Sequence, residues 1–167
     1  KKPYQANEAD IEILKDTTHF RVFDIVDGST RASYFHNALG GYHAAKLNRY
    51  DELFDFHIAK NNMNVINMLN TKYIIAEEEG QIFSFTNTDA NGNAWFVSDV
   101  ERVENANEEL KKLDSLSTKN EAVINDKNIS ADFSTNYSVD ATASIQLTSY
   151  KANELVYESS SNLNQFA

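Results

Sequence analysis

The sequence predicts an α+β fold, in which a mixed or antiparallel sheet packs against two or three helices. Three observations predict it. Apolar residues recur at helical spacing between Tyr42 and Leu69. Short alternating or β-branched runs, which are typical of strands, lie on both sides of that region. Alternation returns over about ten residues near Val139, so we expect residues 127–167 to begin a β-sandwich-like part.

Composition excludes several classes of protein. The 167 residues carry 15 basic and 25 acidic side chains, which gives a formal net charge of −10, and 41% of them are hydrophobic. Without cysteine, disulfides and thiolate metal sites are excluded. The acidic balance argues against a nucleic-acid partner, which needs a concentrated positive surface. The chain is too rich in core-forming residues to be disordered. Its longest apolar run, about four residues, is far short of the roughly 20 that cross a bilayer.

The negative charge is concentrated between residues 72 and 126, which hold 5 basic and 12 acidic side chains. Such a concentration is typical of a solvated face, since net charge governs solubility rather than fold. A cation-binding surface is the alternative. The segment 89–93 has the oxygen-rich spacing of a calcium loop, but the glutamate that completes such a loop is missing.

The first part of the chain predicts a lead-in, a strand and a helix. Residues 1–17 are mostly polar, and we expect them to be flexible. The alternating segment 19–25 predicts a half-buried strand, and Asp27-Gly28 supplies the positive φ of a tight turn. The strongest helix is predicted over 42–58. Its apolar side chains fall on one face: Leu47, Tyr50, Phe54 and Ile58.

The middle of the chain alternates short helices and strands. Helices are expected at residues 63–69 and 108–116, the second capped by Asn107. Strands are expected at residues 72–76, 81–86, 94–97 and 122–124. The first two of these strands are close enough in sequence to pair as a hairpin.

We therefore divide the chain into a lead-in (1–17), an α+β domain (18–126) and a β-rich segment (127–167). Within the last part, residues 139–148 alternate strictly and predict a long strand with one solvated face. Residues 162–167 resemble the opening of another strand, which would leave an exposed sheet edge. Because the sequence also lacks an initiator methionine, we expect it to be truncated from a longer protein.

The sequence contains no motif for catalysis or for a cofactor. It has no nucleophile elbow, no glycine-rich phosphate loop and no Walker pattern. Four histidines are present, but none has the spacing of a zinc site. They are His19, His36, His43 and His57. We therefore expect no catalytic residue, no metal and no cofactor.

The most distinctive segment is 33–50, which reads SYFHNALGGYHAAKLNRY. It places aromatic and cationic side chains on either side of two glycines. Such groups can hold a sugar or a phosphate. The alternative is a helix–loop–helix corner, in which the glycines allow close packing. The candidate ligand-binding residues are Tyr34, His36, Gly40, Gly41, Tyr42, His43, Lys46 and Arg49.

This segment resembles a motif of the large bacterial YfhO-type membrane proteins, S-Y-F-H-x-x-[IL]-G-G-Y-H-x-A-K-L-x-R-Y. The likeness continues through residues 64–75 and 92–97, and more faintly through 107–113 and 122–124. It therefore covers most of residues 18–125.

The resemblance implies a place in a multi-pass glycosyltransferase of the GT-C type, which uses lipid-phosphate-linked sugars. In that class the catalytic acid usually lies in a loop of the membrane half, which is absent here, so the isolated domain is expected to be inactive. We expect a soluble domain on the extracytoplasmic (periplasmic) side of the bacterial cell membrane. Its expected partners are the membrane portion of the same polypeptide and a glycan or lipid-linked sugar. The alternative is a structural or protein-interaction domain of an envelope membrane protein, with no ligand.

Overall fold

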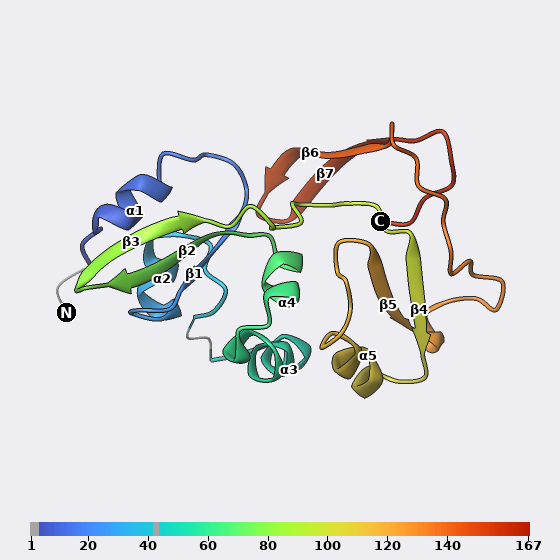
Figure 1. Cartoon of the computed structure of the whole chain (residues 1–167), viewed down its shortest axis with the longest axis horizontal. Coiled ribbons are helices and arrows are strands. Elements are labelled where there is room, and N and C mark those ends of the chain that lie inside the picture. Colours follow the sequence, from blue (N-terminus) through green and yellow to red (C-terminus); the bar gives the residue numbers. More distant parts are fainter. Residues whose placement is uncertain (1–3, 42–43) are drawn as a thin grey trace.

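The computed structural model describes residues 4–41 and 44–167 and confirms the α+β fold class. Its helices are α1 (Glu8–Ile13), α2 (Ser29–Phe35), α3 (Asn48–Phe56), α4 (Met63–Met68) and α5 (Ala106–Lys112), with short 3₁₀ turns η1 (Ile58–Lys60) and η2 (Asp126–Asn128). Its strands are β1 (Arg21–Asp24), β2 (Thr71–Glu78), β3 (Gln81–Thr86), β4 (Asp99–Val103), β5 (Glu121–Asn125), β6 (Ser144–Lys151) and β7 (Glu154–Ser160). Figure 1 shows their arrangement.

The strands form three small sheets. In the first, β2 pairs parallel to β1 and antiparallel to β3, so this sheet is mixed as predicted. The parallel pair needs a long crossover, which α2, α3 and α4 provide. The predicted β2–β3 hairpin is confirmed, and its two turn residues, Glu79 and Gly80, both have positive φ. The other sheets are the parallel pair β4–β5, which is joined through α5, and the antiparallel hairpin β6–β7.

Two buried clusters hold these elements together. One packs α1 against a face of the first sheet: Ala9, Ile13, Phe20, Val22 and Ile75. The other joins the α3–α4 region to α5 and the turn that follows it: Leu39, Ile58, Val65, Ile66, Leu113 and Leu116. In Figure 1, α3 and α4 therefore lie between the first sheet and the β4–α5–β5 unit.

Part of the expected lead-in is helical. Asn7 and Asp10 form a reciprocal capping box that starts α1. Ala9 and Ile13 are buried, with 2% and 0% of their surfaces exposed, and they belong to the first cluster. Ala9 and Ile13, four residues apart, therefore form the buried face of a short helix, whereas Ile11 between them is exposed.

Two predicted helix starts are wrong, and one predicted strand is not formed. The helix expected over 42–58 begins only at Asn48. The helix expected after Asn107 begins at Ala106, because Asn105 is its cap: Oδ1 of Asn105 accepts the backbone N–H groups of Asn107 and Glu108. Residues 94–97 form no strand in the structure, where only Val97 makes an isolated bridge, to Phe166.

The strand predicted over 139–148 begins later, at Ser144, because Asp140 forms a turn. Its carboxylate accepts the hydroxyl of Thr142 and the backbone N–H groups of Asn162 and Thr142. These bonds, the hydroxyl bond first, lower the pKa of Asp140 to about 2. The hairpin contacts the rest of the molecule through Tyr150, whose ring lies 4.1 Å from that of His19, and through Tyr157, whose hydroxyl donates to the carbonyl oxygen of Asn93 at 3.5 Å. A sandwich built on this hairpin stays a prediction.

Across residues 4–41 and 44–167, none of the helices has the length and the apolar character needed to cross a membrane.

Candidate functional site

The structure separates the predicted ligand-binding residues into three groups. Gly40, Gly41 and Lys46 line one cavity, and Arg49 lines a second. Tyr34 and His36 lie at neither of these cavities but line a third, of about 340 Å³. The predictions for Tyr42 and His43 lie outside the described residues.

His36 belongs to a buried ionic cluster. Its Nε2 lies 3.0 Å from Oδ1 of Asp10, and only 3% of its side chain is exposed. Arg31 binds the same carboxylate and lies near the carboxylates of Asp24, at 3.7 Å, and Asp27, at 3.4 Å. Tyr34 is 58% exposed and packs edge-to-face on Tyr4. His36, at the end of α2, therefore helps to hold α2 against α1 through its contact with Asp10.

The cluster holds Asp10 ionised in spite of its burial. Burial, the largest single effect, raises the pKa of Asp10. The hydrogen bonds from Arg31, Asn7 and His36 and the charge of Arg31 together outweigh it, so the pKa falls below its ordinary value. The same contact raises the pKa of Arg31 against the opposing effect of burial. One oxygen of the neighbouring Asp24 is buried without a hydrogen-bond partner among residues 4–41 and 44–167.

A cavity of about 520 Å³ lies beside the first turn of α3. Apolar atoms make up more than half of its lining, but it also holds three charged side chains, and we call it the polar cavity for these charges. Its lining combines the two glycines with ionisable and aromatic side chains: Arg21, Lys46, Tyr50, Asp51 and Phe54. Gly41 has a φ of 146°, which side-chain-bearing residues rarely adopt, so glycine is required there for the backbone. The two adjacent glycines also leave this wall of the cavity without bulk.

The charged groups of the polar cavity are already oriented. Nζ of Lys46 donates to Oδ1 of Asp51 at 2.8 Å, and this bond raises the pKa of Lys46. Nη1 of Arg21 donates to the carbonyl oxygen of Leu69 at 2.8 Å. The hydroxyl of Tyr50 reaches the carbonyl oxygen of Leu39 at 3.3 Å, and burial raises the pKa of Tyr50. The cavity therefore presents both donors and acceptors beside an aromatic ring.

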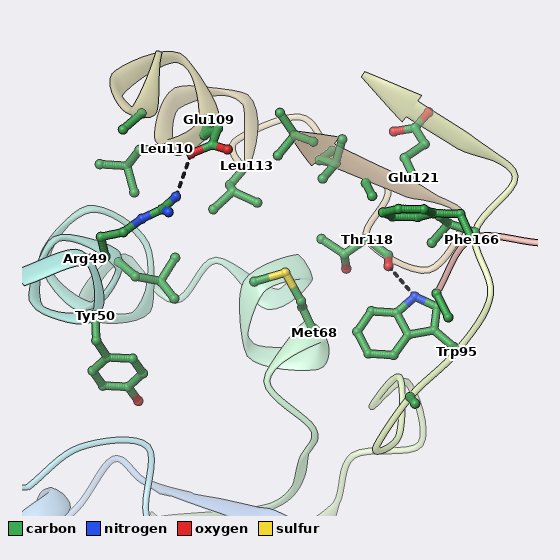
Figure 2. A pocket seen from close by; sticks show the side chains of 18 of the residues that line it. Arg49, Tyr50, Met68, Trp95, Glu109, Leu110, Leu113, Thr118, Glu121 and Phe166 are labelled. Atoms are coloured by element: carbon green, nitrogen blue, oxygen red, sulfur yellow. Dashed lines mark hydrogen bonds and ion pairs between the residues drawn. The ribbon is translucent and has the colours of Figure 1, made fainter. Parts of the chain in front are cut away.

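An apolar cavity of about 720 Å³ lies on the other side of the same turn, between α3–α4 and the β4–α5–β5 unit. Figure 2 shows Met68 near its centre, with Leu110 and Leu113 approaching from α5 and Trp95 and Phe166 at the opposite end. The volume and the mostly apolar lining are those of ordinary small-molecule sites.

Polar contacts mark the two ends of the apolar cavity. At one end, Nη2 of Arg49 donates to Oε2 of Glu109 at 2.6 Å, so an ion pair links α3 to α5. At the other, Nε1 of Trp95 donates to the carbonyl oxygen of Thr118 at 2.9 Å, which fixes the indole ring (Figure 2). Oε1 of Glu109 also accepts the backbone N–H of Asn125 at 2.7 Å.

Leu47 and Tyr50 line both cavities. The first turn of α3 is therefore the wall between a polar and an apolar compartment, and the side chain of Leu47 on it is 81% exposed. An amphipathic ligand could place its polar and its apolar parts on the two sides of this wall. For a metal, no group of three suitable side chains lies together in the part of the chain that the structure describes.

Comparisons of the chain with models of protein families, with curated proteins and with solved structures found no match.

Sequence analysis missed several residues that line the cavities. Trp95 is the only tryptophan of the chain, a signal that could have singled it out. Nothing in the sequence singled out Arg21 or Asp51. Arg21 lies in a strand that is distant in sequence from the other lining residues, and Asp51 is one of many acidic residues. The distant residue Phe166 could be found only from the tertiary structure.

Proposed function

We propose that this chain is the non-catalytic extracytoplasmic domain of a YfhO-type bacterial membrane protein, and that it recognises a glycan or lipid-linked sugar at the polar cavity. The membrane portion of the same polypeptide would carry the catalytic groups. The observation that carries the proposal is the polar cavity itself, which collects Gly40, Gly41 and Lys46 from the segment that resembles the family.

The chemistry of the polar cavity supports a sugar ligand. Sugar hydroxyls both donate and accept hydrogen bonds, and Lys46 and Asp51 offer one group of each kind within a single ion pair. The rings of Tyr50 and Phe54 can pack against the apolar face of a sugar. Arg21, Lys46 and Asp51 give the lining of the polar cavity a formal charge of +1. This charge favours a glycan that carries an anionic group.

A titration followed by amide NMR tests this proposal. Oligosaccharides released from a bacterial envelope, with and without anionic groups, are added to the labelled domain. We expect shifts at Gly40, Gly41, Lys46 and Asp51, larger for the anionic set, because both the ion pair and Arg21 face the ligand. Absence of shifts there with every oligosaccharide would contradict glycan recognition.

Two double variants provide the comparison. Lys46→Gln with Asp51→Asn removes both charges of the cavity pair, which is 2.8 Å long, and we expect it to weaken glycan binding about tenfold. Lys151→Gln with Glu154→Gln removes an exposed pair of the same length on the β6–β7 hairpin. That control should bind glycan as the wild type does. Equal losses in the two variants would place binding elsewhere.

The membrane context is tested separately, by the parent gene. The proposal requires apolar segments of about 20 residues in the translated sequence that flanks this chain. A full-length gene product without them would contradict both the family and the membrane location, whatever the titration shows.

A structural or protein-interaction role is the second candidate, and exposed aromatic residues on β3 favour it. Phe83 and Phe85 are 38% and 43% exposed on the same face of this edge strand. Such a face can pack against another protein domain. Substitution of both by Ser should then weaken assembly of the full-length protein without changing the glycan titration, and an unchanged assembly would count against this role.

A further inference from the structure

We propose that the apolar cavity is a second binding site, whose ligand is a small amphipathic cation: a hydrocarbon body that carries an ammonium group. The inference does not rest on the proposed glycan function, because that function uses the polar cavity. It is carried by the size of the apolar cavity, its aromatic end and the charges around it.

The hydrocarbon body of the ligand would lie along the centre of the cavity. Leu53 and Met68 line it from α3 and α4, and Leu110 and Leu113 line it from α5 and the residue that follows that helix. Figure 2 shows Met68 between these leucines and Trp95. A volume of about 720 Å³ accommodates a small ligand, and the flexible thioether of Met68 can adjust to its shape.

The ammonium group would lie at the aromatic end. Figure 2 shows Phe166 and Trp95 at the same end of the cavity, with Glu121 on the far side of Phe166 and its carboxylate directed away from Trp95. Both rings are held in place: Trp95 by its bond to Thr118, and Phe166 by the rings of Phe133 and Tyr137 at 5.5 and 5.9 Å. Fixed aromatic faces attract ammonium groups, and more strongly where water is excluded.

The charge of the lining favours a cation over an anion. Three carboxylates and one guanidinium line the cavity, so their formal charge is −2: Arg49, Glu52, Glu109 and Glu121. Arg49 already binds Glu109 at the far end. Oε2 of Glu121 accepts the backbone N–H of Ser117 at 2.9 Å, and within the described residues no donor binds its other oxygen. The negative charge of this carboxylate would attract an ammonium group held at the aromatic end, without a hydrogen bond to it.

Trp95 provides the readout, because it is the only tryptophan of the chain and it lines the cavity. Three probes share an eight-carbon chain and differ in the head group: octyltrimethylammonium, octyl sulfate and octyl glucoside, each used below its micelle concentration. We expect the cation to change the fluorescence of Trp95 and to bind about tenfold more tightly than the sulfate. This preference should shrink as salt is added, because salt screens the carboxylates.

Glu121→Gln is the informative variant. Glutamine keeps an oxygen that can accept the Ser117 N–H, so the fold is expected to persist, while the charge is lost. We expect affinity for the cation to fall about fivefold, with glucoside affinity unchanged. Glu154→Gln, on the exposed hairpin, is the matched control and should leave all three affinities unchanged.

Three results would overturn the proposal. The first is no response of Trp95 to any probe. The second is a sulfate affinity equal to or greater than that of the cation, and the third is an unchanged cation affinity in Glu121→Gln. Should Glu121→Gln fail to fold by circular dichroism, the ranking of the three probes by the wild-type protein and its salt dependence decide the question.

Discussion

At the residue scale, the clearest finding is that His36 and Asp10 act as a buried pair. The sequence placed His36 among ligand-binding candidates because it lies in a distinctive aromatic and cationic segment. The structure joins it instead to a carboxylate 26 residues away, with Arg31 on the same carboxylate. Burial without a partner would be costly for each of these groups, so they stabilise one another.

We predict that Asp10→Asn destabilises the protein by about 3 kcal/mol, because it leaves Arg31 with a buried and poorly paired charge. Urea unfolding at pH 7 measures this loss. Glu12→Gln, on the exposed face of the same helix, is the control and should cost under about 0.5 kcal/mol.

The contact between Asp10 and Arg31 also makes the stability of the protein depend on pH. The pKa of Asp10 lies below its unfolded value of 3.8, so its contribution is complete above about pH 4 and is lost as the pH falls through the folded-state pKa. The acid-induced loss of stability should therefore be smaller in Asp10→Asn than in the wild type. Parallel stability curves for the two proteins below pH 4 would contradict this.

At the element scale, short helices depend on their caps more than on their own propensity. The α5 helix is an example, since it covers only Ala106–Lys112. Asn105 and Asn107 lie two residues apart, shortly before Glu108, and either could cap a helix, yet only Asn105 has the extended backbone of a cap. The difference arises because the chain leaves β4 in an extended conformation that ends at Asn105.

We predict that Asn105→Ala costs about 1 kcal/mol of stability, because two backbone N–H groups lose their acceptor. Asn107→Ala, inside the helix and exposed, should be neutral or slightly stabilising. Thermal unfolding of the two variants measures the difference. An equal loss in both would mean that the helix begins where the sequence alone suggested.

At the scale of the whole molecule, His57 links the α3–α4 region to α5. Its side chain is 2% exposed, and Nε2 donates to the carbonyl oxygen of Leu110 at 2.8 Å. Nδ1 accepts from the amide of Asn62 at 3.2 Å, and that amide also donates to the carbonyl oxygen of Leu113. This contact holds the β4–α5–β5 unit against the rest of the chain on one side of the apolar cavity.

We predict that His57→Phe destabilises the protein by about 2 kcal/mol, because the carbonyl oxygen of Leu110 loses its donor inside the protein. Hydrogen exchange should accelerate more in β4, α5 and β5 than in the first sheet. His19→Phe removes a more exposed bond, to Asn93, and should cost under about 1 kcal/mol, since water can replace that bond. A uniform acceleration of exchange in His57→Phe would contradict a local linking role.

Local patterns in the sequence were enough to predict the class of the fold and most of its elements. Strands β2 and β3, their hairpin and α4 follow from β-branched runs, helical spacing and turn residues, all of which are local patterns. Tertiary structure decided the rest. Asp10 meets His36, and Arg49 meets Glu109, across long separations in sequence. The apolar cavity gathers Met68, Trp95 and Phe166 from separate segments. Local periodicity sets which face of each helix or strand is apolar. Which of these faces pack together depends on the total apolar surface that all the elements bury, and this cannot be derived from one segment at a time.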